Sequence, residues 1–243
     1  MDGILRCSRY AFGPNRLHYC GPDRNREIFS YVNESEADVG LSDLLSQFET
    51  MYPYLRHIAT ANKIREPLDN RVVEAYWLGN KLLDNVSKKD FYNYLVDDFR
   101  LKDKLDVRSF DLVKDKIGEG ALPHHSFHVL DVWRRTGKQE REHSVSNMSE
   151  CLVSIGEVVS VSGPFITVKT EPLIYSNGKL AFGNPEEKKL VRQLESDYDI
   201  EQLKKGDLVS IHWSVICEKI TKQQAENLRK YTNHHIRLAN QTL

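Results

Sequence analysis

The feature that most constrains the fold of this 243-residue chain is a change in the spacing of its apolar residues near residue 150. From about residue 41 to residue 137, apolar side chains recur at every third or fourth position, which is typical of amphipathic helices. After residue 150 they alternate in short β-branched runs, which is typical of half-buried strands. We therefore predict an α+β fold in which an all-helical domain, residues 1–137, precedes a strand-rich domain, residues 150–243.

Within the first half, prolines and capping residues predict where helices begin. Residues 41–63 carry an apolar stripe in which Pro53 begins a second helix or kinks the first. Pro67 suits the first position of a further helix, and Ser87 followed by Asp90 forms a capping pattern for the next.

Two other segments lack helical spacing. Residues 1–35 are rich in Gly, Pro and Asn, which predicts a loop. Residues 138–149 are polar and without periodicity, which predicts a linker between the two domains.

The second half predicts a small antiparallel, OB-like β-barrel followed by a C-terminal helix. Asn177-Gly178 between two apolar runs is a strong hairpin signal. Residues 206–220 predict one long strand, and residues 185–197 predict a short helix inserted in the barrel. Thr221 and Gln224 form a capping box at the start of the last helix.

Composition narrows the class of partner. The net charge is -1, and residues 151–243 hold 12 Lys and Arg against 11 Asp and Glu. A balance of this kind does not favour nucleic acid or an anionic membrane as a partner. No apolar run is long enough for a signal peptide or a membrane span, and the four cysteines are widely spaced. We expect a cytoplasmic protein with reduced thiols.

Cys151 and His212 are the candidate site of the second half. Three short motifs follow one another in this half. They are Cys151, Leu152, Gly156 and Val158; then Gly206, Asp207 and His212; then a stretch that ends at Ala225. In this order and spacing, residues 150–240 resemble the HypC-type hydrogenase maturation chaperones. Read without the resemblance, Cys151 is a buried strand cysteine and His212 a half-buried strand histidine.

The resemblance implies a role for both residues. In that family the leading cysteine, here Cys151, holds an iron centre that bears cyanide and carbon monoxide, and the strand histidine, here His212, is tied to the iron or to partner contacts. A thiolate is a strong, soft ligand, and a carrier with few protein ligands can release its cargo. The partners implied are an iron-sulfur scaffold protein of hydrogenase maturation and the precursor of a hydrogenase large subunit.

The first half offers a candidate second metal site, which consists of Cys7, Cys20, His124 and His128. His124 and His128 are one helical turn apart, and a loop that carries both cysteines could fold over them. The alternative is that His124 and His125 simply begin a helix after Pro123.

We therefore expect a chaperone that carries an iron fragment or docks on a metalloenzyme precursor, and not an enzyme, because the sequence contains no phosphate loop, nucleophile elbow or H-E-x-x-H motif. The alternatives are a metal-independent protein-binding scaffold and an oligonucleotide-binding small barrel.

Overall fold

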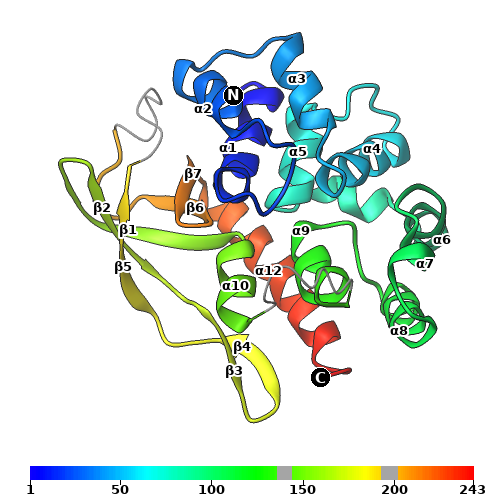
Figure 1. Cartoon of the computed structure of the whole chain (residues 1–243). Helices are drawn as coiled ribbons and strands as arrows, with labels where there is room; N and C mark the ends of the chain where they lie inside the picture. Colours follow the sequence, from blue (N-terminus) through cyan, green and yellow to red (C-terminus); the bar gives the residue numbers. More distant parts are fainter. Residues whose placement is uncertain (136–143, 193–201) are drawn as a thin grey trace.

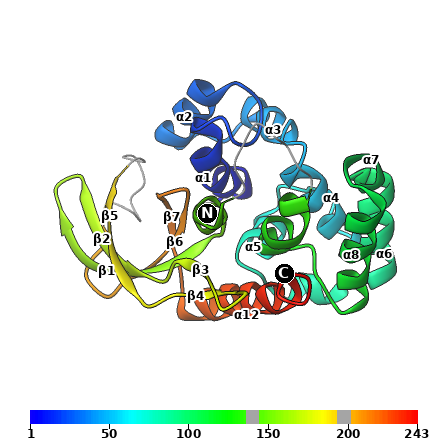
Figure 2. The same ribbon diagram turned by 60° about the horizontal axis from the view of Figure 1, so that its bottom comes forward.

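The computed structural model describes residues 1–135, 144–192 and 202–243. Helices fill one side of the molecule, an antiparallel sheet fills the other, and the C-terminal helix α12 runs beneath both (Figures 1 and 2). The described helices are α1 (Gly3–Arg16), α2 (Asn25–Glu34), α3 (Val39–Ser46), α4 (Met51–Ala61), α5 (Asn70–Trp77), η1 (Lys81–Asn85), α6 (Lys88–Asn93), η2 (Tyr94–Asp98), α7 (Leu101–Lys104), α8 (Val107–Gly118), α9 (His125–Phe127), η3 (His128–Val132), η4 (Trp133–Arg135), α10 (Val145–Cys151) and α12 (Lys222–Ala239).

Residues 1–35 form two helices, so the predicted loop is wrong. The carboxylate of Asp2 caps α1 by accepting hydrogen bonds from the next turn, and most of α1 is buried. Gly13 does not form a turn but lets α1 pack closely against β6, because a Cβ at this position would lie 2.6 Å from the carbonyl oxygen of His212. Pro14 stays inside the helix, where it lacks the N–H that would bond to the carbonyl of Tyr10.

Several predicted helix starts are confirmed. Pro53 lies in the first turn of α4, so the apolar stripe divides into two helices. The side chain of Ser87 caps α6, and Thr221 and Gln224 form the capping box of α12. Pro67 precedes its helix, because Asp69 caps α5 and the helix begins at Asn70.

The strands form a five-stranded antiparallel sheet in the order β5-β2-β1-β6-β7 and a separate two-stranded sheet, β3-β4. Their bounds are β1 (Ser154–Ser162), β2 (Phe165–Thr170), β3 (Leu173–Ser176), β4 (Lys179–Phe182), β5 (Glu186–Val191), β6 (Leu208–His212) and β7 (Val215–Lys219). Within the described residues β5 and β7 are edge strands with no ladder between them, so the predicted closed barrel is wrong. The hairpin β3-β4 packs against α10 and α12 and adds no strand to the larger sheet.

Turns explain the other differences. The hairpin at Asn177-Gly178 is confirmed, with φ angles of 51° and 79°. The predicted long strand is instead the hairpin β6-β7, because Trp213 and Ser214 both have positive φ, at 51° and 61°. The first part of the predicted inserted helix is strand β5, and residues 193–197 lie outside the described residues.

Buried residues of the two predicted domains pack together. One continuous cluster of buried residues runs from α1 and α5 through the strands to α12. The predicted linker is a helix over the part that is described, since residues 145–151 form α10, while 138–143 lie outside the described residues. None of the described helices is both long and apolar enough to cross a membrane.

A buried polar network joins α1 to the sheet. The Arg6 Nε donates to the Glu218 Oε1 over 2.8 Å, and the Arg6 Nη1 donates to Glu74 over 2.9 Å. The Tyr10 hydroxyl donates to the same Glu218 oxygen over 2.6 Å and lies 2.8 Å from the Ser210 hydroxyl. Because Arg6 and Glu218 are almost fully buried, α1 is held in a fixed position against β6 and β7.

Candidate metal-binding site

His212 is the last residue of β6, and α1 fixes its orientation. The His212 Nδ1 donates to the carbonyl oxygen of Tyr10 over 2.7 Å. That carbonyl is available because Pro14, four residues later, has no N–H to donate to it. Since Nδ1 holds the ring proton, Nε2 carries a lone pair. Among the described residues, this buried Nε2 has no hydrogen-bond partner.

Cys151 approaches His212 from a helix. It is the last residue of α10, and the following strand begins at Ser154, so the prediction that Cys151 opens a strand is wrong. Burial and, to a smaller extent, the nearby Cys20 raise the pKa of its thiol to about 12, against the opposing effect of the Trp213 indole. Cys151 is therefore a protonated thiol at neutral pH, and binding a metal would release that proton.

His125, the first residue of α9, adds a third donor. Its Nε2 lies 3.9 Å from the Cys151 Sγ and donates to the Cys151 carbonyl oxygen over 2.8 Å. Its Nδ1 therefore accepts from the Tyr76 hydroxyl, over 3.2 Å. The donor atoms of His125, Cys151 and His212 all lie within 4.8 Å of one another.

Burial keeps both histidines neutral. It lowers the pKa of His212 to about 4, against the opposing effect of the carbonyls of Tyr10 and Cys151 and of Glu150. Burial also lowers the pKa of His125 well below its usual range, and the neighbouring His212 adds to this effect. Neutral imidazole is the form that ligates metals, so no histidine proton has to leave the site before binding.

The spacing of the three donors suits one metal ion after a small closure. Metal–sulfur bonds of about 2.3 Å and metal–nitrogen bonds of about 2.1 Å place the donors of a tetrahedral ion about 3.6 Å apart. The observed 3.9 Å between Cys151 and His125 is close to this value. Ligation by His125 would require its ring proton to move from Nε2 to Nδ1, which would then donate to the Tyr76 hydroxyl oxygen, and the hydrogen bond to the Cys151 carbonyl would be lost.

A cavity of about 430 Å³ lies over the three donors. Its lining includes the charged residues Glu49, Asp103 and Lys104 and the aromatic residues Tyr19, Phe48, Tyr76, Trp77, Phe99, Trp133 and Trp213. An outer groove of about 1050 Å³ adjoins it, and Tyr19, Cys20, Glu49, Thr50 and Trp133 line both. The donors thus face a largely apolar space that continues into a wider groove.

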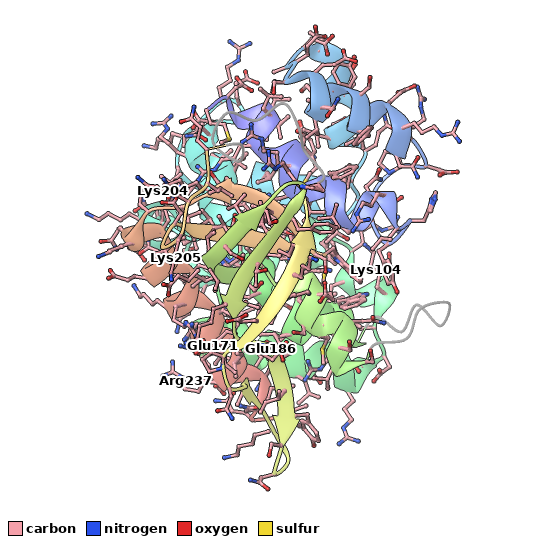
Figure 3. The ribbon with its side chains drawn as sticks, turned by 90° about the vertical axis from the view of Figure 1, so that its left-hand side faces the viewer. Lys104, Glu171, Glu186, Lys204, Lys205 and Arg237 are labelled. Atoms are coloured by element: carbon pink, nitrogen blue, oxygen red, sulfur yellow. The ribbon has the colours of Figure 1, made fainter. Side chains whose placement is uncertain are left out.

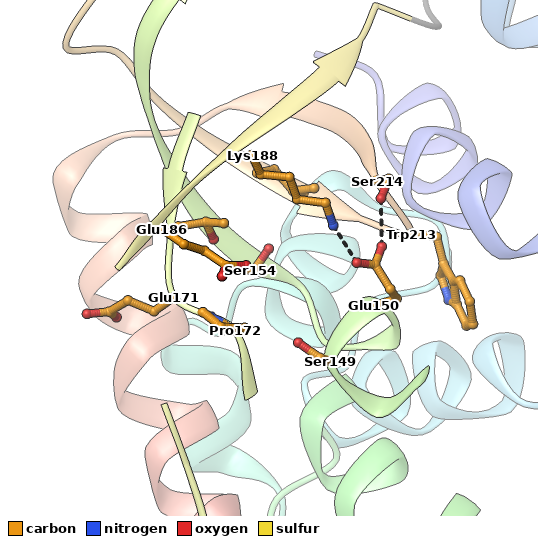
Figure 4. A pocket seen from close by; sticks show the side chains of 11 residues that line it. Ser149, Glu150, Ser154, Glu171, Pro172, Glu186, Lys188, Trp213 and Ser214 are labelled. Carbon is orange, nitrogen blue, oxygen red and sulfur yellow. Dashed lines mark hydrogen bonds and ion pairs between the residues drawn. The ribbon is translucent and has the colours of Figure 1, made fainter. Parts of the chain in front are cut away.

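Glu150 holds Cys151 in place from the opposite side. Its carboxylate pairs with Lys188 and accepts a hydrogen bond of 2.7 Å from the Ser214 hydroxyl, as Figure 4 shows. Its carbonyl accepts from the Trp213 backbone N–H over 2.9 Å. These contacts surround a hollow of only about 40 Å³, enough for one or two waters. They tie the end of α10 to the β6-β7 turn, and so fix Cys151 relative to His212.

The four residues of the candidate second site do not converge on one point, so this prediction is wrong as a four-ligand site. The Cys7 thiol lies 3.4 Å from the Met51 sulfur in the core. His124 caps α9, with its Nδ1 2.8 Å from the Ser126 hydroxyl. Cys20 and His128 do line the cavity described above, but the described residues contain no second group of three donors within reach of one metal.

His125 was missed for a structural reason. The i, i+4 spacing of His124 and His128 assumes a regular helix, whereas His124 is a cap and α9 passes after three residues into the π-helix η3. The sequence signal that could have identified His125 is the whole run of histidines after Pro123, taken without a helical register.

No curated protein and no solved structure matches this chain. One protein family does match, and the match spans residues 1–243, so it includes the helical half, the sheet and all three donors. The chain therefore belongs to the family of unknown function DUF6390.

Proposed function

We propose that the protein is a metal-cargo carrier in which Cys151, His212 and His125 hold an iron fragment bearing cyanide and carbon monoxide for delivery to a metalloenzyme precursor. The nature of the cargo rests on the resemblance of residues 150–240 to the HypC-type chaperones. The observation that carries the proposal is the convergence of Cys151 and His212, from two different elements, with a buried His212 Nε2 that no described residue bonds.

The site has the properties that a carrier requires. The Tyr10 carbonyl holds the His212 ring in the tautomer that presents Nε2, as outer contacts commonly do for metal-binding histidines. Cys151 supplies a thiolate once its proton has left. Two or three protein ligands leave positions on the metal for other groups, whereas a closed four-ligand site would retain the metal.

The cavity fits a cargo larger than a bare ion. A volume of about 430 Å³ accommodates several diatomic ligands around one metal, since a water-sized group takes about 30 Å³. Its aromatic walls limit water at the metal. The partners that the resemblance implies are an iron-sulfur scaffold protein that supplies the cargo and a hydrogenase large-subunit precursor that receives it.

The oligonucleotide-binding alternative gains little support from the surface. On the sheet side of the molecule, Lys204 and Lys205 lie toward the upper part of the view, whereas Glu171 and Glu186 lie below them (Figure 3). Tracking a phosphate backbone favours a continuous positive surface.

Infrared spectroscopy combined with iron analysis tests the proposal. The full-length protein is isolated anaerobically from its native host, beside Cys151→Ser and the control Cys217→Ser, whose thiol is fully buried and does not line the cavity. We expect cyanide and carbonyl bands and bound iron in the wild type and the control, and neither in Cys151→Ser. Iron-free wild-type protein that still binds its partners would contradict the proposal and indicate a metal-independent scaffold.

A further inference from the structure

A second thiol, Cys20, lies between the outer groove and the cavity. It lines both, whereas Cys151 lines the cavity alone. Cys20, like Cys151, is partly exposed, in contrast to the fully buried Cys7 and Cys217. A group that moves from the groove to the three donors therefore passes Cys20 before it reaches Cys151.

The backbone around Cys20 is held in place. The Asn15 side chain donates to the carbonyls of both Cys20 and Pro22, each over 2.9 Å. Tyr19 packs on Trp213 with ring centroids 4.3 Å apart. Gly21 has a φ of 85°, and a Cβ there would lie 2.4 Å from the ring of Phe48. These contacts keep Cys20 at the mouth of the cavity.

Two further observations connect Cys20 with ligand binding in this cavity. The buried His212 Nε2 and His128 Nδ1 have no hydrogen-bond partner among the described residues, and both histidines line the same cavity as Cys20. Cys20 and Cys151 also line the same cavity.

We propose that Cys20 is the exchange thiol of the carrier, the residue that takes the metal from an incoming donor and later accepts it from Cys151 for release. This inference rests on the proposed function, because it assumes that the metal is bound at Cys151 and His212. It adds a path for the metal, which enters from the outer groove, binds Cys20 at the mouth of the cavity and then passes to Cys151.

The exchange is a ligand substitution without redox change. On the way out, the bond between Cys20 sulfur and the metal forms while the bond between Cys151 sulfur and the metal breaks. The proton that leaves the Cys20 thiol ends on the Cys151 sulfur. The metal keeps its oxidation state, so no oxidant or reductant is consumed, and loading is the same step in reverse.

Cobalt(II) loading of the full-length protein tests the inference in vitro. Thiolate-to-cobalt absorption measures binding under anaerobic conditions, and a coloured chelator added in excess measures release. The variants are Cys20→Ser and Cys20→Ala, with Cys217→Ser as a control thiol outside the cavity and Cys151→Ser as the control for the site itself.

We expect both Cys20 variants to bind cobalt with the same stoichiometry as the wild type but to load and release it about tenfold more slowly, which corresponds to about 1.4 kcal/mol in activation free energy. Cys217→Ser should exchange at the wild-type rate. Binding that depends on Cys151 but exchange rates unchanged in both Cys20 variants would overturn the inference and leave the proposed function standing. Absence of cobalt from the wild type and Cys151→Ser alike would overturn both.

Alkylation supplies a second readout. In the cobalt-loaded protein, mass spectrometry after brief treatment with iodoacetamide should find Cys20 modified and Cys151 protected. Protection of Cys20 together with full modification of Cys151 would contradict the path, because it would place the metal at the mouth instead of at the three donors.

Discussion

The sheet side and the helical side of the cavity each contribute a histidine, and the two are prepared differently. His212, on β6, donates through Nδ1 to the Tyr10 carbonyl and leaves Nε2 without a hydrogen bond among the described residues. His125, on α9, uses both nitrogens, one with the Tyr76 hydroxyl and the other with the Cys151 carbonyl. The His212 ring is ready to bind a metal, whereas the His125 ring must first lose a hydrogen bond and move its proton from Nε2 to Nδ1.

This difference suggests a division of labour. The sheet side supplies a preorganised pair, Cys151 and His212, whose geometry Glu150 and α1 fix from outside. The helical side supplies a donor that joins at an energetic cost, since a buried hydrogen bond contributes about 1 kcal/mol. A site of this kind retains a cargo with two ligands and tightens when the third one joins, which suits a protein that must also release what it carries.

We expect the helical side and the sheet side to unfold together, and a variant of the buried Arg6–Glu218 pair tests this. Glu218→Ala leaves the guanidinium of Arg6 buried without one of its two carboxylates. Breaking a buried ion pair in this way costs about 3–5 kcal/mol, so we expect a loss of that size in the free energy of unfolding. Urea denaturation, followed in parallel by circular dichroism and tryptophan fluorescence, measures it.

Glu226→Ala, at an exposed position on α12, is the matched control and should change the free energy of unfolding by less than about 0.5 kcal/mol. Coincident transitions for the two probes would agree with a single core. Two separate transitions in the wild type would instead restore the picture of two independent domains.

The next largest effect separates the two histidines. We expect His212→Gln to weaken cobalt(II) binding about 100-fold and His125→Gln about tenfold, because only the His212 nitrogen is preorganised and metal sites respond to lost contacts on this scale. Competition with a chelator of known affinity gives both dissociation constants. His18→Gln, a histidine whose side chain is 60% exposed, should leave binding unchanged.

Equal losses in the two variants would remove the distinction between the two sides. A larger loss in His125→Gln than in His212→Gln would reverse it and place the main ligand on the helical half.

The pH dependence of binding follows from the protonation states. Burial raises the pKa of Cys151 to about 12, so the metal displaces one proton from its thiol throughout the neutral range. Both histidines have a lowered pKa and are neutral there. Affinity should therefore rise about tenfold for each pH unit between pH 6 and pH 8. Measured dissociation constants that do not change with pH would show that Cys151 binds as a preformed thiolate.

Much of the local structure was predictable from the sequence, because it depends on neighbouring residues. The caps at Ser87 and Thr221 and the hairpin at Asn177-Gly178 are of this kind. The helix over residues 3–16 was not predictable, since its Gly13 serves a contact with His212, about 200 positions away in the chain. The turn at Trp213 was hidden for a similar reason, because tertiary contacts hold this tryptophan at positive φ.

The candidate site shows the same limit. Cys151 and His212 were identified through spaced motifs, and the structure brings them together. His125 follows from the packing of α9 against the end of α10, which no local pattern encodes. The closed barrel failed as a prediction because strand spacing along the chain does not specify whether β3 and β4 join the larger sheet.

The smallest effect we expect concerns Pro14, which lines the cavity without being one of the three donors and affects His212 through the Tyr10 carbonyl. In Pro14→Ala, the new N–H can bond to that carbonyl within α1 and compete with the His212 Nδ1. His212 then loses part of its orientation, so cobalt affinity should fall about fivefold, near the lower end of the effects of outer contacts on metal sites. Thermal stability should not fall, because alanine is favoured over proline inside a helix. A combined loss of affinity and stability would point to general damage to α1, whereas weaker binding in a fully stable protein would show that the helical half orients the ligand of the sheet.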